Sequence, residues 1–113
     1  MKTLSGVIII AVIVLVLVGA AFFLTRPSDS GKNEIKIESF AFNPLTLTIK
    51  LGDTVTWENY DSVAHTVTSD SGSELNSTYL AKAQEYSHTF NTRGTFDYHC
   101  IPHPNMKGKI IVE

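Results

Sequence analysis

Near its C-terminal end the chain reads Phe96-Asp97-Tyr98-His99-Cys100-Ile101-Pro102-His103-Pro104-Asn105-Met106. This stretch indicates both the fold and the chemistry of the chain. Phe96, Tyr98 and Cys100 alternate with polar residues, which is the period of a β-strand with one buried face. We therefore predict a strand that ends at or near Cys100 and delivers its thiol to the end of a sheet.

The second half of the stretch predicts a stiff loop that carries three metal-binding side chains. Cys100, His103 and Met106 set a thiol, an imidazole and a thioether at every third position. Pro102 and Pro104 fix their own φ angles and keep the residues before them away from helical conformations. A loop so constrained can aim all three side chains at one point.

The same alternation of apolar and polar residues extends outward from this stretch. It recurs over residues 35–37, 45–51, 55–57, 65–68, 86–90 and 107–112. Turn signals such as Gly52-Asp53 separate the runs, and residues 69–83 form a long polar loop. About seven short strands favour an antiparallel sandwich or barrel, because parallel strands need long crossover connections.

A fourth metal-binding side chain must come from elsewhere, and His65 is the best candidate. It follows a break at residues 59–62 and opens a strand segment. Two imidazoles and a thiolate, with a weakly held thioether, form the arrangement of blue copper centres, and these ligands suit both oxidation states of copper. We therefore predict one copper ion held by His65, Cys100, His103 and Met106.

Other interpretations of these residues stay open at this point. Cys100 is the only cysteine, so it has no partner for an internal disulfide. Taken alone, it would be a small buried apolar residue, and Met106 would fill the core. Zinc would accept Cys100, His65 and His103. A thioether is a poor zinc ligand, however, so the complete pattern favours copper.

The remaining two histidines are not expected to bind this metal. His99 directly precedes Cys100, so strand alternation directs its side chain to the opposite face. His88 shares a face with Tyr86 and Phe90, which favours a buried, hydrogen-bonded histidine over a second metal site.

The N-terminal segment differs in composition from the rest of the chain. Residues 6–24 contain no charged residue, and a helix that crosses a bilayer needs roughly 20 apolar residues. A cleaved signal peptide has a shorter apolar stretch of ~7–15 residues, and here residues 22–24 continue the apolar run. We expect a single-pass membrane anchor over residues 1–26 and a flexible tether over 27–33. With or without cleavage, the domain would lie outside the cytoplasm.

The folded domain is expected to cover residues 34–113. It carries six basic and ten acidic residues and no basic stripe, which excludes nucleic acid as a partner. A domain this small buries a limited fraction of its surface and often depends on a metal or another cross-link.

Two segments resemble the cupredoxins, the type 1 blue copper proteins. Residues 51–57 are similar to the strand that leads to the first histidine ligand, and residues 94–106 to the strand and loop with the other ligands. The short loop is similar to that of amicyanins, whereas plastocyanins place two more residues between histidine and methionine. The resemblance implies a Greek-key β-sandwich with His65, Cys100 and His103 as equatorial ligands and Met106 as the axial ligand.

The implied function is outer-sphere electron transfer, because four protein ligands leave no metal position for a substrate. No enzymatic activity is expected: the four histidines include no His-x-His pair of the kind that multicopper oxidases need. Hydrolysis by a cysteine nucleophile is disfavoured by the spacing of Met106. Expected partners are redox proteins, such as a cytochrome, a dehydrogenase or an oxidase. A module that stores or delivers copper is the alternative.

Overall fold

The alternating segments form eight β-strands in the computed structural model, which describes residues 33–113. Their bounds are β1 (Glu34–Glu38), β2 (Ala41–Asn43), β3 (Thr46–Ile49), β4 (Thr54–Asn59), β5 (Thr68–Ser69), β6 (Glu85–Thr89), β7 (Gly94–His99) and β8 (Lys107–Val112). The predicted anchor over residues 1–26 lies outside the described residues. Within residues 33–113, no helix is long and apolar enough to cross a membrane.

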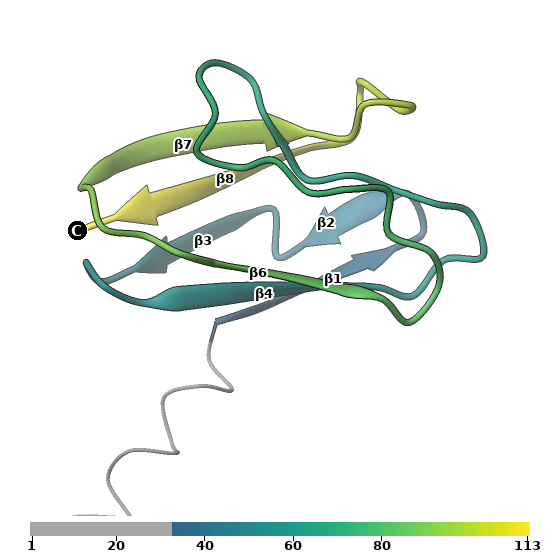
Figure 1. Ribbon diagram of the computed structural model, residues 1–113, viewed down its shortest axis with the longest axis horizontal. Coiled ribbons are helices and arrows are strands. Elements are labelled where there is room, and N and C mark those ends of the chain that lie inside the picture. Colours follow the sequence, from purple (N-terminus) through teal and green to yellow (C-terminus); the bar gives the residue numbers. More distant parts are fainter. Residues whose placement is uncertain (1–32) are drawn as a thin grey trace, which may run out of the picture. The chain divides into compact units, whose positions relative to one another are not determined.

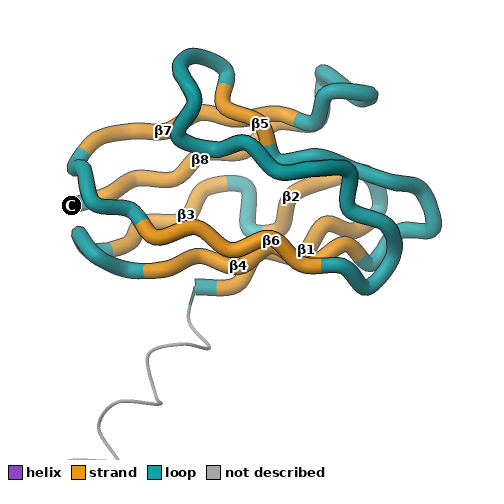
Figure 2. The backbone as a smooth tube through the Cα atoms, in the orientation of Figure 1, coloured by secondary structure: helices purple, strands orange, loops and turns teal. Residues whose placement is uncertain are grey.

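The strands form two four-stranded sheets that face each other, as Figures 1 and 2 show. One sheet has the order β2-β1-β4-β6 and the other the order β3-β8-β7-β5. The all-β sandwich that the sequence predicted is therefore confirmed.

The prediction of a purely antiparallel arrangement was wrong. β1 pairs in parallel with β4, and β3 pairs in parallel with β8. A parallel pair needs a long connection, and here the strands themselves provide it. The chain passes through β2 and β3 between β1 and β4, and through four further strands between β3 and β8.

One predicted strand is shorter than its sequence pattern. Residues 45–51 alternate throughout, yet only Thr46–Ile49 form β3. Leu45 and Leu51, at the two ends of the pattern, are 63% and 39% exposed. Alternation predicts which face a residue takes within a strand, but burial also requires that the opposite sheet extends that far.

The core lies between the sheets and is built from one face of each layer. A buried hydrogen bond crosses it, because Trp57 Nε1 on β4 donates to the hydroxyl of Tyr98 on β7 at 3.1 Å. Burial raises the pKa of the Tyr98 hydroxyl well above its ordinary value, so this group stays neutral. Tyr98 lies two residues before Cys100, so this bond anchors the strand that carries the thiol.

Tyr98 also needs a glycine on the neighbouring strand. Gly108 on β8 is its cross-strand partner, and a Cβ atom at that position would overlap the Tyr98 ring and hydroxyl. We predict that Gly108→Ala lowers the free energy of unfolding by about 1–3 kcal/mol, as expected for overpacking of a core. Urea unfolding of the metal-free domain measures the loss. The exposed neighbour provides the control, since Lys109→Ala should change the free energy by less than about 1 kcal/mol. Equal effects of the two substitutions would contradict the proposed close packing.

Candidate metal centre

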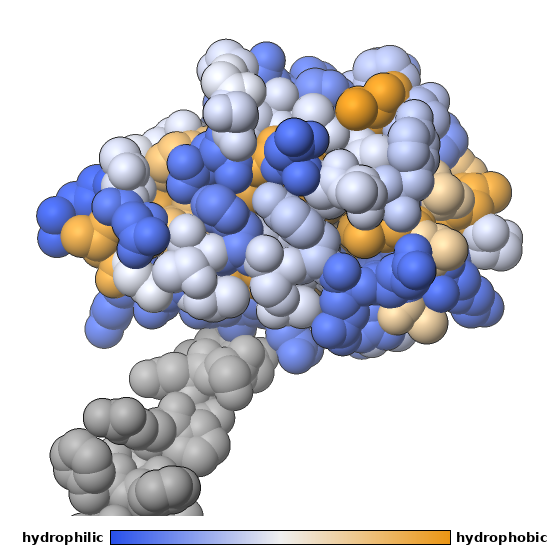
Figure 3. Space-filling model, in the orientation of Figure 1, coloured by the Kyte–Doolittle hydropathy of each residue, from blue (hydrophilic) through white to orange (hydrophobic). Residues whose placement is uncertain are grey.

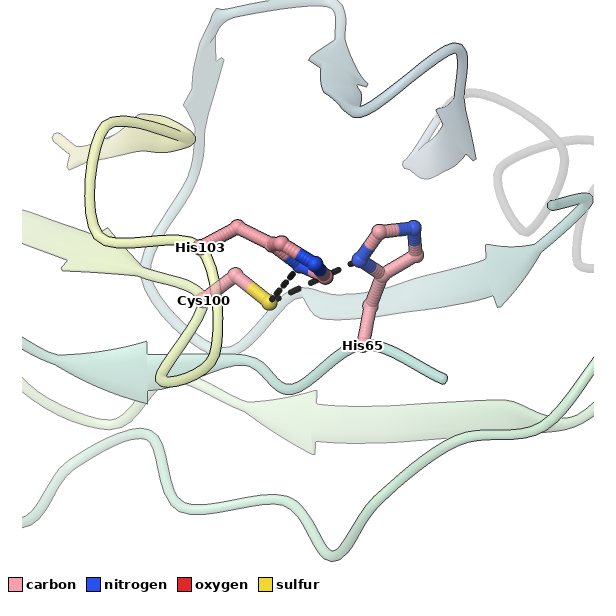
Figure 4. Close-up of side chains that lie close together, drawn as sticks. All are labelled: His65, Cys100 and His103. Atoms are coloured by element: carbon pink, nitrogen blue, oxygen red, sulfur yellow. Dashed lines mark hydrogen bonds between the residues drawn. The ribbon is translucent and has the colours of Figure 1, made fainter. Parts of the chain in front are cut away.

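Three side chains from separate segments meet at one end of the sandwich. Cys100 directly follows β7, His103 lies in the loop between β7 and β8, and His65 lies in the connection between β4 and β5. Their nitrogen and sulfur ligand atoms all lie within 4.8 Å of one another. Figure 4 shows both imidazole rings turned toward the Cys100 sulfur, which is 3.5 Å from each Nδ1 atom.

These distances fit a metal ion bound between the three atoms. Metal–nitrogen and metal–sulfur bonds of about 2.0–2.3 Å, separated by roughly 100–120°, place two ligand atoms about 3.3–3.8 Å apart. The observed separations of 3.5 Å lie in this range. Imidazole and thiolate donors are also the set expected for copper. The residues therefore fit the ion that the sequence predicted.

The ligand loop is held by its own backbone. The Cys100 N–H donates to the Met106 carbonyl at 3.1 Å, and the His103 N–H donates to the Cys100 carbonyl at 3.2 Å. The Met106 N–H in turn donates to the His103 carbonyl at 2.9 Å. Met106 is only 5% exposed at the end of this loop. Three backbone hydrogen bonds thus cross-link the predicted loop, and the binding of copper by its side chains stays a prediction.

Thr66 fixes the surroundings of the sulfur. Its backbone N–H donates to Cys100 Sγ at 3.4 Å, and its hydroxyl accepts a hydrogen bond from the Ile101 N–H at 2.9 Å. Thr66 is buried, and its bond to the sulfur is shielded from water. The structure shows that Thr66 links the His65 segment to the ligand loop.

Asp61 holds the opposite side of the His65 ring. Its Oδ2 atom lies 2.8 Å from His65 Nε2. Donation from Nε2 leaves the Nδ1 lone pair directed at the metal position, which is how carboxylates orient histidine ligands. Asp61 was not predicted from the sequence. The available signal was an acidic residue four positions before His65.

The remaining histidines are placed largely as expected. His99 points away from the centre and its Nδ1 lies 2.6 Å from Asp70 Oδ1. His88 Nε2 lies 2.9 Å from Glu74 Oε1. His88 is hydrogen-bonded as predicted but only partly buried, because β6 is the edge strand of its sheet. Among the described residues, the cluster at Cys100 is the one group of three such side chains placed to hold a metal.

Comparison with known families agrees with this geometry. Residues 29–113 match the family model of copper-binding proteins of the plastocyanin/azurin family. The chain belongs to this family. Its cofactor is therefore copper, and the family consists of cupredoxin-type electron-transfer proteins.

Individual relatives support the assignment. Amicyanin-alpha of Methylorubrum extorquens is 38% identical over 101 residues, which cover 86% of this chain and 85% of the relative. Amicyanin of Paracoccus denitrificans is 38% identical over 102 residues, covering 79% of this chain and 78% of the relative. An oxidised methionine-to-leucine mutant of amicyanin superposes with a TM-score of 0.69 at 39% identity, covering 74% of this chain and 83% of that one. A purple cupredoxin from Nitrosopumilus maritimus superposes with a TM-score of 0.66 at 31% identity, covering 71% of this chain and 98% of that one.

The hydrogen bonds to Asp61 predict how stability depends on pH. Partial burial raises the pKa of this carboxyl, but bonds from the Phe40 N–H, the His65 ring and the Ser39 N–H outweigh it and hold the pKa below its usual range. A carboxyl whose pKa is lower in the folded state than in the unfolded state stabilises the fold at pH values above its ordinary pKa of about 3.9. This stabilisation is lost as the pH falls through the folded-state pKa.

We therefore predict that Asp61→Asn destabilises the metal-free domain at neutral pH. The difference in unfolding free energy between the wild type and this variant should stay constant above about pH 5 and shrink in more acidic solution. Urea unfolding at a series of pH values measures it. A difference that does not change down to the lowest pH at which the domain folds would contradict the lowered pKa of Asp61.

Proposed function

We propose that this chain is a type 1 copper protein that carries single electrons, with His65, Cys100 and His103 as equatorial ligands and Met106 as the axial ligand. The observation that carries the proposal is the equal 3.5 Å separation of the Cys100 sulfur from the two Nδ1 atoms. Bound copper would supply one-electron chemistry by alternating between Cu(II) and Cu(I). The hydrogen bonds of Thr66 and Asp61 would hold the ligands in one geometry for both states.

The surroundings of His103 favour electron exchange over catalysis. Its ring is only partly buried, whereas His65 and Cys100 are fully buried. Phe40, Val63 and Ile101 are exposed apolar residues, and each lies in a loop or turn at this end of the sandwich. Figure 3 shows apolar residues gathered at the right-hand end, where these loops lie, beside a mainly hydrophilic face.

This apolar end would dock a redox partner with the outer edge of the His103 ring near the contact. Apolar patches rimmed by polar residues mark interaction sites on soluble domains. The partner would be another redox protein, such as a cytochrome, a dehydrogenase or an oxidase. The domain itself would perform no chemical conversion, because its ligands leave no coordination position free.

We also propose that the domain works outside the cytoplasm, held at the cell membrane by its N-terminal segment. The uncharged run over residues 6–24 supports this location. A role in copper storage or delivery is the alternative. It would require release of the ion, which the buried and hydrogen-bonded ligands disfavour.

The first prediction of this proposal concerns colour. Residues 33–113, loaded with Cu(II), should show an intense visible charge-transfer band and a narrow copper hyperfine splitting in the EPR spectrum, since a thiolate binds the ion. Cys100→Ser should abolish the band while leaving the imidazoles in place. Cyclic voltammetry should show reversible one-electron cycling without loss of copper. A blue Cys100→Ser protein would refute the ligand assignment, and loss of copper on reduction would favour storage or delivery.

The second prediction concerns the axial ligand. Met106→Leu should retain the blue colour, because the equatorial ligands are unchanged. It should raise the reduction potential, because leucine has no sulfur that donates electron density to the oxidised ion. Voltammetry of the wild type and the variant measures the shift. Replacement of the exposed Leu45 by alanine is the control and should leave the potential unchanged. An unchanged potential in Met106→Leu would remove Met106 from the site.

A further inference from the structure

One aromatic side chain contacts both histidine rings of the centre. The centroid of the Phe40 ring lies 5.2 Å from that of His65 and 4.8 Å from that of His103. The interplanar angles are 87° and 81°, so both contacts are edge-to-face. Phe40 is 51% exposed. One side of its ring therefore faces the two imidazoles while the other faces solvent.

Phe40 lies in the two-residue turn of the β1–β2 hairpin, which requires positive φ angles at both of its central residues. Ser39 and Phe40 connect β1 to β2 with φ angles of 55° and 57°. This left-handed region is costly for residues with a Cβ atom, and a bulky residue there is a genuine outlier. Such strain persists only where the surrounding structure compensates for it.

The compensation comes from the same carboxylate that orients His65. Asp61 Oδ1 accepts a hydrogen bond from the Ser39 N–H at 2.8 Å, and Oδ2 accepts one from the Phe40 N–H at 2.9 Å. Oδ2 also lies 2.8 Å from His65 Nε2. A single carboxylate therefore joins the strained turn to a histidine of the centre.

Among the described residues, His103 has no comparable hydrogen bond to orient its ring. Within residues 33–113, its ring is hydrogen-bonded only through Nδ1, toward the Cys100 sulfur. Its other defined ring contacts are with Phe40 and with His65, whose centroid lies 5.0 Å away. The orientation of the more exposed histidine thus depends on aromatic packing rather than on a hydrogen-bonding partner.

We propose that Phe40 is a positioning residue that keeps the His103 ring in its binding orientation and shields the metal position from water and small anions, and that Asp61 holds Phe40 in that place. The inference rests on the proposed function, since it takes His65 and His103 as ligands. It assigns Phe40 a role inside the centre in addition to any part in docking a partner.

Removal of the ring tests this role directly. Phe40→Ala should weaken Cu(II) binding roughly two- to ten-fold, the effect expected for loss of an aromatic pair. It should also let azide perturb the visible and EPR spectra at concentrations that leave the wild type unchanged. The reduction potential should fall, because water stabilises the more highly charged oxidised centre. Phe40→Leu, which keeps apolar cover, should restore much of the protection from azide.

Two controls separate this role from general stability. Leu45→Ala removes another exposed apolar side chain, which lies in the connection between β2 and β3, and should change none of these properties. Asp53 accepts a backbone hydrogen bond from the Lys50 N–H in another turn at 3.0 Å. Asp53→Ala should therefore lower stability without changing the spectra, whereas Asp61→Ala should change both and admit azide as Phe40→Ala does.

The outcomes distinguish failure of this inference from failure of the proposed function. Wild-type protein that shows no thiolate-to-copper band would overturn the proposed function. A blue wild type with copper affinity, potential and azide response unchanged in Phe40→Ala would overturn only the positioning role. Should Asp61→Ala fail to fold, the Phe40 variants still decide the question, because the half-exposed ring is not part of the buried core.

Discussion

An imidazole brought beside a thiol in a buried site must be held there against its preference for water. Cys100 and His65 are fully buried, and polar groups withdrawn from solvent destabilise a fold unless they are paired. Each receives a partner: the Thr66 N–H for the sulfur and the Asp61 carboxylate for the His65 ring. Among the described residues, no buried side-chain nitrogen or oxygen lacks a hydrogen bond.

The sandwich makes this arrangement possible because it fixes three segments that are distant in sequence. β7 brings Cys100 to the end of one sheet and is anchored across the core by the bond between Trp57 and Tyr98. The His65 segment is held by backbone bonds in both directions with Leu80, at 3.1 and 2.8 Å. The polar loop between β5 and β6 therefore does more than connect two strands. It supplies the pairing that places the first histidine.

Local sequence features predicted much of this correctly. Alternation identified strand faces, so that His99 and Cys100 were expected to point in opposite directions, and the spacing within residues 100–106 identified the loop that brings Cys100 and His103 to His65. The parallel pairs were missed because alternation describes the faces of a strand and says nothing of its neighbours. The Asp61 contacts with Ser39 and Phe40 were missed for a similar reason. They join residues 22 and 21 positions apart through a turn whose left-handed conformation no glycine or asparagine signalled.

The two histidines show how an electron-transfer site can be rigid and accessible at once. His65 is buried and held by Asp61, so its position is determined by the fold. His103 must come close to the surface if electrons are to leave through its ring, and a second carboxylate there would add charge where a partner docks. An aromatic neighbour avoids that conflict. Phe40 restrains the ring and excludes water, yet its outer side is apolar and stays compatible with contact by another protein. The Asp61 carboxylate that fixes the inner histidine thus also fixes the aromatic cover of the outer one.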